Sequence, residues 1–216
     1  MDTLVKIADF SNELSKLTNL IDGIDNSNRI LHVKVFDMVY SSTPSNEIVS
    51  PSTNDSIKDL GSEIIDEIDK AIKLIIENFN PQKVWLVFYT PNSGLDFHYD
   101  NSIRYILPIN TDEKFYYYEL VLPIGDDPHH PPYGPSDYCN LYSKKIKELP
   151  EEEFNQKFVS DGNRILKLEP GCVYTYVDSV GHTVLNRHKT KIRCSIVFDL
   201  FDKPIPTETP QTIRMI

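Results

Sequence analysis

Three features are scarce or missing in this sequence, and each absence disfavours a class of protein. The chain has only 3 cysteines in 216 residues, widely spaced and without a CxxC pair, which predicts reduced packing residues rather than a disulfide framework. No apolar run approaches the roughly 18 residues that a membrane-spanning helix needs. Residues 1–10 carry charge and no long apolar stretch, so they do not resemble a signal peptide. We therefore expect a soluble cytoplasmic protein.

Positively charged residues are also fewer than negatively charged ones. The chain has 22 Lys and Arg against 32 Asp and Glu, a net charge of −10, and no separate basic block. An acidic chain is repelled by the phosphates of nucleic acids and of anionic membranes, so neither is the expected partner. With 40% hydrophobic residues the chain can build a full core. The expected partner is a small-molecule or peptidyl substrate, and the oligomeric state stays open.

The N-terminal part of the chain contains two helical patterns around one strand pattern. Apolar residues at three- and four-residue steps predict helices over 11–21 and 56–79. Asp55 or Ser56 is the expected cap of the longer helix. Residues 30–40 are rich in β-branched and aromatic types, which predicts a strand. The longer helix is expected to pack along the outside of a sheet.

The rest of the chain has the pattern of strands. Many short strands without helices alternating between them indicate an antiparallel sandwich or barrel. The insertion 123–160 begins with five of the 15 prolines and is a natural lid or substrate-facing loop. We expect a single domain over 1–216, in which 1–81 supports a core at 82–202 and 203–216 forms a tail. The strand patterns lie at 83–90, 96–107, 113–122, 163–168, 172–178, 182–187 and 191–201.

Candidate metal ligands lie on two of these predicted strands. In the triplet His98-Tyr99-Asp100, the first and third side chains fall on one face, because side chains alternate across a strand. His182 opens a later strand that a barrel can bring opposite. Two histidines and one carboxylate are the ligands that hold non-haem Fe(II) while leaving other coordination positions open. We therefore predict an iron site of His98, Asp100 and His182.

A candidate co-substrate anchor follows the second histidine. Arg193 comes eleven positions after His182, enough for one strand, a turn and a return, and Ser195 shares its face. The strand around Arg193 is otherwise apolar, so a buried cation there needs a partner. The planar guanidinium fork binds a carboxylate in bidentate fashion, which suits a dicarboxylate held on the metal by its other end.

Taken together, these residues resemble the Fe(II)/2-oxoglutarate-dependent dioxygenases, whose motif is HxD, a distal His and an Arg about ten residues later. The segments Phe97-His-Tyr-Asp-Asn-Ser-Ile-Arg-Tyr-Ile-Leu-Pro108 and Val177-Asp-Ser-Val-Gly-His-Thr-Val-Leu-Asn186 look most like the aspartyl/asparaginyl β-hydroxylase group. That group often has Arg-x-His after its first motif, where this chain has Arg104-Tyr105-Ile106. The spacing of 182 − 98 = 84 residues between the histidines is also long, and the insertion 123–160 accounts for the excess.

The resemblance covers residues 82–202 and implies a mainly β fold, a double-stranded β-helix (jelly-roll, cupin-like) core with flanking helices. It implies Fe(II), 2-oxoglutarate and O₂, with hydroxylation of an unactivated C–H bond and release of succinate and CO₂. Arg193 and Ser195 would bind 2-oxoglutarate. Asp100 as third ligand fills the position that a halogenase leaves vacant, which favours hydroxylation. An amino acid, free or in a peptide, is the implied substrate.

Several alternatives remain open from the sequence. His188 is a rival distal ligand, although its polar surroundings predict a hairpin turn. His129 and His130, between prolines, are expected to be solvated or to touch substrate rather than metal. A non-catalytic cupin-like binding module and a barrel metalloenzyme that does not use 2-oxoglutarate are the rival functions. The candidate contacts to substrate or 2-oxoglutarate are Arg104, Asn186, Tyr133 and Tyr138.

Overall fold

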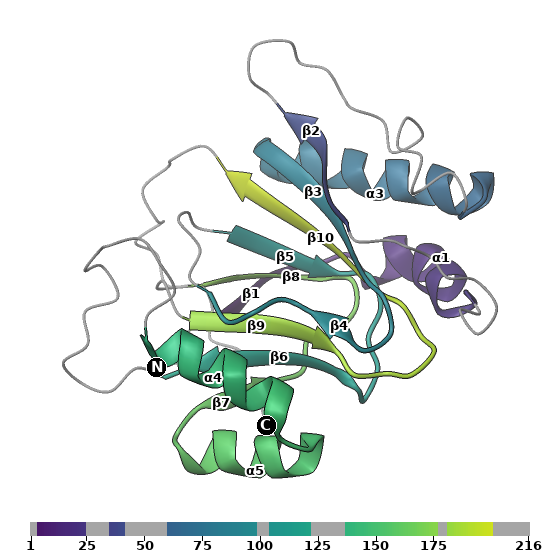
Figure 1. Cartoon of the computed structure of the whole chain (residues 1–216). Helices are drawn as coiled ribbons and strands as arrows, with labels where there is room; N and C mark the ends of the chain where they lie inside the picture. Colours follow the sequence, from purple (N-terminus) through teal and green to yellow (C-terminus); the bar gives the residue numbers. More distant parts are fainter. Residues whose placement is uncertain are drawn as a thin grey trace.

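Two antiparallel sheets face each other, and helices cover the outer face of each (Figure 1). The structure is a computed structural model, which describes residues 4–24, 35–41, 60–98, 104–121, 137–176 and 181–200. At 35–41, 137–138 and 176 the description covers the backbone alone.

The larger sheet has six strands in the order β1-β8-β5-β10-β3-β2. Its central strands carry the longest runs of β-branched and aromatic residues, which fit a pleated surface buried on both faces. Every neighbouring pair is antiparallel. The strands are β1 (Leu4–Asp9), β2 (Val35–Ser41), β3 (Pro81–Tyr89), β5 (Arg104–Pro108), β8 (Cys172–Tyr176) and β10 (Arg193–Leu200).

The smaller sheet has four strands in the order β4-β9-β6-β7. Its central pair, β9 and β6, is antiparallel over six residue pairs. The strand β4 is only two residues long, and a single further bridge at His98 extends its pairing with β9. The strands are β4 (Ser93–Gly94), β6 (Phe115–Leu120), β7 (Arg164–Leu166) and β9 (Gly181–Asn186).

The path of the chain between the sheets identifies the architecture. From β3 to β10 the described strands alternate between the larger and the smaller sheet, except that β6 and β7 follow each other in the smaller sheet. Eight strands shared equally between two sheets in this way form a double-stranded β-helix, or jelly roll. The strands β1 and β2 extend the larger sheet at its two edges. The predicted fold class is confirmed.

The helices α1 (Ser11–Asp22) and α3 (Ser62–Phe79) cover the outer face of the larger sheet (Figure 1). The apolar stripe of α3 packs against outward-facing residues of β3 and β10, as the sequence predicted. The helix begins at Ser62 and not at residue 56, because Gly61, at the N-cap position, has a φ of 88° that a helix cannot contain. The helix α3 thus begins later than predicted, and the predicted cap residues, Asp55 and Ser56, lie outside the described part of the chain.

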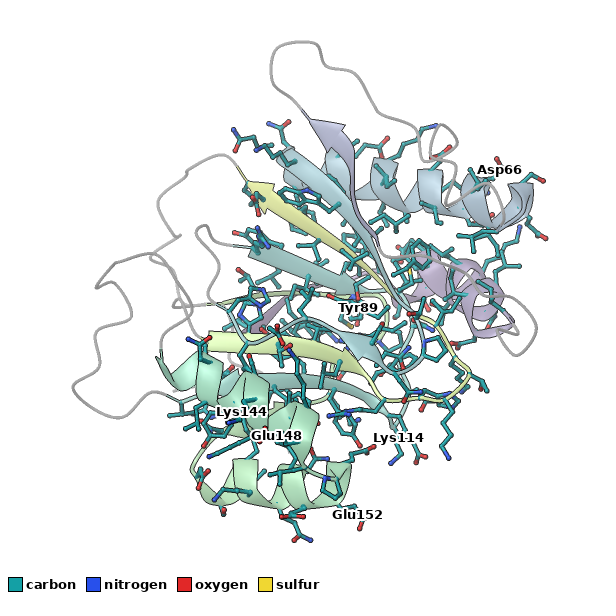
Figure 2. All side chains as sticks on the ribbon, in the orientation of Figure 1. Asp66, Tyr89, Lys114, Lys144, Glu148 and Glu152 are labelled. Carbon is teal, nitrogen blue, oxygen red and sulfur yellow. The ribbon has the colours of Figure 1, made fainter. Side chains whose placement is uncertain are left out.

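The helices α4 (Asp137–Glu148) and α5 (Glu151–Ser160) cover the outer face of the smaller sheet. Their apolar faces join Phe97 and Tyr118 in an aromatic cluster. The charged residues Lys144, Glu148 and Glu152, labelled in Figure 2, are exposed to solvent. These helices belong to the predicted insertion, and they pack on the outside of the sheet and not over its inner face. Residues 122–136 of the chain lie outside the described part.

A third apolar cluster fills part of the space between the sheets, with Val87 and Val197 from one sheet and Tyr117 and Val184 from the other. All three cysteines are free and buried, as predicted. Among the described residues, no helix is long and apolar enough to cross a membrane.

Two strands were not expected from the sequence. In β1, only Leu4 is buried, so its apolar pattern is weak, and its place is set by pairing with β8. In β4, two residues are too few to show any pattern. The predicted strand 96–107 is observed as a bridge at His98 and as β5, and residues 99–103 lie outside the described part.

Gly171 offers a test of how the first helix is joined to the barrel. Its φ is 78°, its carbonyl accepts a hydrogen bond from Phe10 N–H at 2.8 Å, and an added Cβ would lie 2.4 Å from Ser11 Cα. Gly162 has a similar φ of 87° with nothing near the Cβ position, so it is the matched control. We expect Gly162→Ala to cost about 1–2 kcal/mol from backbone strain. Gly171→Ala should cost at least about 1 kcal/mol more from the clash, measured by urea unfolding. Equal losses would contradict this packing.

Candidate active site

His98 and His182 are direct neighbours across the smaller sheet. Each backbone N–H donates to the carbonyl of the other residue, at 3.0 and 2.9 Å. Residues paired in this way project their side chains from the same face. The two imidazole rings accordingly lie with their centres 4.6 Å apart. The structure thus brings the two predicted histidine ligands together from distant segments of the chain.

The orientation of both rings is restrained. His98 Nδ1 lies 2.8 Å from the carbonyl oxygen of Asp96. A carbonyl can only accept, so Nδ1 carries the proton and Nε2 keeps its lone pair for a metal. His182 is 4% exposed and stacks on the ring of Tyr117, with centres 5.6 Å apart. Metal-binding histidines are commonly held by a hydrogen bond from the ring nitrogen that does not bind the metal, as the Asp96 carbonyl holds His98 here.

The third predicted ligand, Asp100, lies outside the described residues. Within the described ranges, which break off between 98 and 104, no group of three His, Cys, Asp or Glu residues is arranged to hold a metal. Asp100 follows His98 by two positions. Its role as third ligand stays a prediction.

The rival ligand His188 lies in the turn between β9 and β10. Its Nδ1 accepts hydrogen bonds from the backbone N–H groups of Thr190, at 3.1 Å, and Lys191, at 2.9 Å. This nitrogen is therefore occupied in closing the hairpin turn. His182, not His188, stands beside His98. His129 and His130 lie outside the described residues.

Arg193 is buried at the start of β10, with its side chain between the two sheets. It is 2% exposed and donates from one terminal nitrogen to the backbone carbonyls of Tyr116, at 2.8 Å, and Leu185, at 3.2 Å. The ring centres of Tyr89 and Phe115 lie 5.9 Å from its guanidinium carbon. Tyr89 marks this region between the sheets in Figure 2. Aromatic faces and carbonyl oxygens help to offset the cost of burying a guanidinium group.

Ser195 lies two residues further along the same face of β10 and is 3% exposed. Its Oγ has no hydrogen-bond partner within the part of the chain that the structure describes. A buried hydroxyl without a partner costs free energy, commonly about 1–3 kcal/mol. Such an atom at the wall of a pocket is consistent with a ligand that supplies the missing bond.

A pocket between the sheets connects these groups. The space between its atoms, including the open mouth, is about 420 Å³. Five of its ten lining residues are apolar or aromatic, and the other five are two histidines, two arginines and one serine, so polar groups that can orient a small ligand project from apolar walls. The lining residues are Tyr89, Leu95, His98, Arg104, Ile106, His182, Val184, Arg193, Ser195 and Val197.

A second cation adds to the positive charge near Arg193. Lys167 Nζ donates to the carbonyls of Glu113 and Phe115 and lies 4.1 Å from the centre of the Tyr116 ring. Burial lowers the pKa of Lys167, and the charge of Arg193 lowers it further. The charges of Asp112, Glu113 and Glu151 act in the opposite direction and raise the pKa of Lys167.

The remaining predicted contacts fall in different places. Arg104 lines the pocket. Asn186 donates both amide hydrogens to the carbonyls of Tyr89 and Lys191, and its oxygen accepts from His188 N–H. It thus ties β9 to the neighbouring turn and is not among the lining residues of the pocket. Tyr133 lies outside the described residues, and only the backbone of Tyr138 is described, in α4.

One residue near the site was not found from the sequence. Glu119 is the register partner of His182 on one side and of Arg164 on the other. Its side chain is fully buried, and its Oε1 lies 3.4 Å from an Arg164 nitrogen. A single carboxylate in the run Phe115–Leu120, otherwise aromatic and apolar, was the available signal. The register pairing places Glu119 next to His182 on the neighbouring strand.

The comparisons with known proteins find distant structural likeness. Neither a family model nor a curated protein matches the sequence. A cupin domain from Bordetella pertussis Tohama I is 15% identical, with a TM-score of 0.32 over 56% of this chain and 81% of that one. AviO1 from Streptomyces viridochromogenes Tue57 is 10% identical, with a TM-score of 0.43 over 97% of this chain and 92% of that one. Neither likeness supports the narrower resemblance to the aspartyl/asparaginyl β-hydroxylase group.

The choice of histidine can be tested by metal binding. We expect His182→Ala to weaken Mn(II) affinity by more than about 100-fold, since even residues that only orient a metal ligand are worth about 10- to 100-fold. His188→Ala should keep the wild-type affinity, because its ring closes a turn. Calorimetric titration with Mn(II) measures both. Loss in His188→Ala with retention in His182→Ala would reverse the assignment.

Glu119 gives a second metal-binding test. Glu119→Gln keeps the shape of the side chain but removes the negative charge beside His182, and we expect Mn(II) affinity to fall about tenfold. Glu148→Gln makes the same charge change on α4, where the carboxylate is exposed and paired with Lys144, so it is the matched control. Equal Mn(II) affinity in the two variants would show that Glu119 serves only the fold.

Proposed function

We propose that this protein is an Fe(II)- and 2-oxoglutarate-dependent oxygenase that hydroxylates an unactivated C–H bond, with release of succinate and CO₂. One observation carries the proposal. A buried arginine shares one pocket with a pair of adjacent histidines and with a buried serine whose Oγ has no hydrogen-bond partner among the described residues. A simple binding barrel has no use for a cation buried opposite a histidine pair. The iron and the dicarboxylate together account for all four residues.

The residues present fit the metal. His98 offers Nε2 because its other nitrogen donates to the Asp96 carbonyl, and His182 stands beside it. Asp100 is proposed as the carboxylate that completes the set, which is the ligand type that suits Fe(II) alongside two histidines. When bound, the iron supplies the activation of O₂ that no amino-acid side chain provides. The carboxylate of Glu119, in register with His182, helps to keep that ring in place.

The residues present also fit the co-substrate. Arg193 uses one terminal nitrogen for the carbonyls of Tyr116 and Leu185. These bonds hold the guanidinium plane in a fixed orientation, in which it can take up the distal carboxylate of 2-oxoglutarate as a fork. Ser195 Oγ–H donates to the same carboxylate and gains the partner that it lacks among the described residues.

The walls of the pocket keep water away from the reaction. Ile106, Val184 and Val197 are aliphatic residues in the wall of the pocket that the histidines and arginines also line. Excluding water strengthens the interactions of the charged groups and protects a reactive site from side reactions. The protein's own contribution is therefore binding, orientation and exclusion of water.

For the substrate we propose an amino acid, either free or within a peptide. Support comes from the likeness of segments 97–108 and 177–186 to the aspartyl/asparaginyl β-hydroxylases. Arg104, at the pocket wall, is a group of this chain that such a substrate would meet.

The proposal is tested first with the co-substrate alone. Wild-type protein with Fe(II), ascorbate and O₂ should convert 2-oxoglutarate to succinate, slowly in the absence of substrate. With Mn(II) in place of iron, 2-oxoglutarate should bind without turnover, and calorimetry measures its affinity. If 2-oxoglutarate neither binds nor turns over while Mn(II) does bind, the protein is a barrel metalloprotein of another kind. If Mn(II) does not bind either, it is a non-catalytic binding module.

Two variants then separate a ligand contact from a structural role. Ser195→Ala removes a hydroxyl that has no partner among the described residues, so its free energy of unfolding should equal or exceed that of the wild type. Its affinity for 2-oxoglutarate should nevertheless fall by about 2- to 10-fold. Arg193→Lys keeps the charge and loses the fork, and we expect a loss of at least about tenfold. Calorimetry and urea unfolding measure the two properties. A destabilised Ser195→Ala with unchanged affinity would contradict the role of Ser195.

A further inference from the structure

We propose that the substrate carries a carboxylate and that Arg104 binds it at the end of the pocket remote from Arg193. This inference rests on the proposed function and names the class of substrate. It is based on the order of polar and apolar residues along the inner face of β10 and of its neighbour β5.

Four alternate residues of β10 share the inner face, because side chains of a strand alternate. In chain order they are Arg193, Ser195, Val197 and Asp199. The last of these is the register partner of Arg104 on β5. Polar groups therefore lie at the two ends of this face, and Val197 with its neighbour Ile106 lies between them.

The separation of the two arginines shows that one small ligand does not use both. Arg104 on β5 is paired with Asp199 on β10. Asp199 lies 199 − 193 = 6 residues after Arg193 on β10, which is roughly 20 Å along an extended strand. A five-carbon dicarboxylate has four C–C bonds of about 1.5 Å each, so its length stays below roughly 6 Å. A 2-oxoglutarate held at Arg193 and Ser195 does not reach Arg104, which faces another part of the same pocket.

Arg104 is held in a manner that suits recognition of a planar acid. Its guanidinium carbon lies 5.4 Å from the centre of the Trp85 ring, and its Nε lies 3.6 Å from Asp199 Oδ1. The ring supports one face and the carboxylate steadies the inner nitrogen of the group. The side chain is still 26% exposed and lines the pocket. A supported guanidinium loses little freedom when it pairs with a carboxylate.

The charges around Arg104 favour a carboxylate over a phosphate. Asp199 stands between Arg104 and Lys83 as the register partner of both. The three residues sum to one positive charge, which a carboxylate neutralises. A phosphate group carries closer to two negative charges at neutral pH and would leave an excess beside Asp199.

The middle of the pocket indicates the rest of the molecule. The aliphatic lining residues of the pocket include Ile106 and Val197, next to the Arg104–Asp199 pair on β5 and β10, and Val184, two residues after His182 on β9. Their side chains offer no partner to a polar group. A substrate held by its carboxylate at Arg104 therefore presents a short aliphatic portion to His98 and His182. Small aliphatic acids, amino acids included, meet this requirement.

The test compares acids with their amides on the loaded protein. Free amino acids and linear monocarboxylic acids of three to six carbons are each paired with the primary carboxamide. Their binding to protein loaded with Zn(II) and 2-oxoglutarate is measured by ligand-observed NMR. At least one acid should bind the wild type at least about tenfold more tightly than its amide, because the amide loses the charged hydrogen bonds.

Variants of the two cations next to Asp199 locate the effect. In Arg104→Gln the preference for the acid should disappear, and in Lys83→Gln, which makes the same change of charge one strand away but leaves the guanidinium fork in place, a reduced preference should persist. Arg104→Lys, which keeps the charge and has a smaller effect on packing, should keep part of the preference. Affinity for 2-oxoglutarate, measured with Mn(II), should be the same in all four proteins.

Each other outcome contradicts the inference. If no acid binds the wild type better than its amide, the substrate is not recognised by a carboxylate. If Lys83→Gln loses the preference as fully as Arg104→Gln, the effect is one of general charge. If Arg104→Gln loses 2-oxoglutarate, Arg104 belongs to the co-substrate site. Failure of the proposed function is seen separately, as wild-type protein that does not bind 2-oxoglutarate at all.

Discussion

The site depends on one backbone pairing, the two hydrogen bonds exchanged by His98 and His182. Paired strands leave no freedom in which face each side chain takes, so this bridge alone decides that both imidazoles enter the pocket. The second constraint is the burial of Arg193. The carbonyls of Tyr116 and Leu185 offset only part of the cost of removing its guanidinium from water, because they carry no net charge. The fold thus holds the guanidinium of Arg193 in the wall of the pocket that His98 and His182 also line.

Much of the architecture could be predicted from the sequence, because it follows from local patterns. The apolar stripe of α3 and the alternation along β10 are strong enough to place both elements. The predicted start of α3 was too early. Gly61 has a positive φ, so the helix begins only after it, although apolar residues precede it in the sequence. The strand β1 was missed because its position comes from pairing with β8, with Leu4 opposite Tyr176, and not from a pattern of its own.

The candidate site also contains residues that the sequence could predict and residues whose role depends on tertiary contacts. His98, His182, Arg193 and Ser195 could be predicted because their chemistry and order along the chain are distinctive, and the structure places all four around one pocket. Asn186 was predicted from its face on β9 alone, and the structure uses its amide to close a turn. Such a role depends on backbone groups that a sequence does not display.

The most direct test of the central claim is a crystal structure of the protein with Mn(II) and 2-oxoglutarate. We expect the metal on Nε2 of His98, on His182 and on the carboxylate of Asp100. The distal carboxylate of 2-oxoglutarate should lie on Arg193 and Ser195, and Arg104 should make no contact with it. A metal bound away from the two histidines, or a 2-oxoglutarate that does not reach Arg193, would contradict the account.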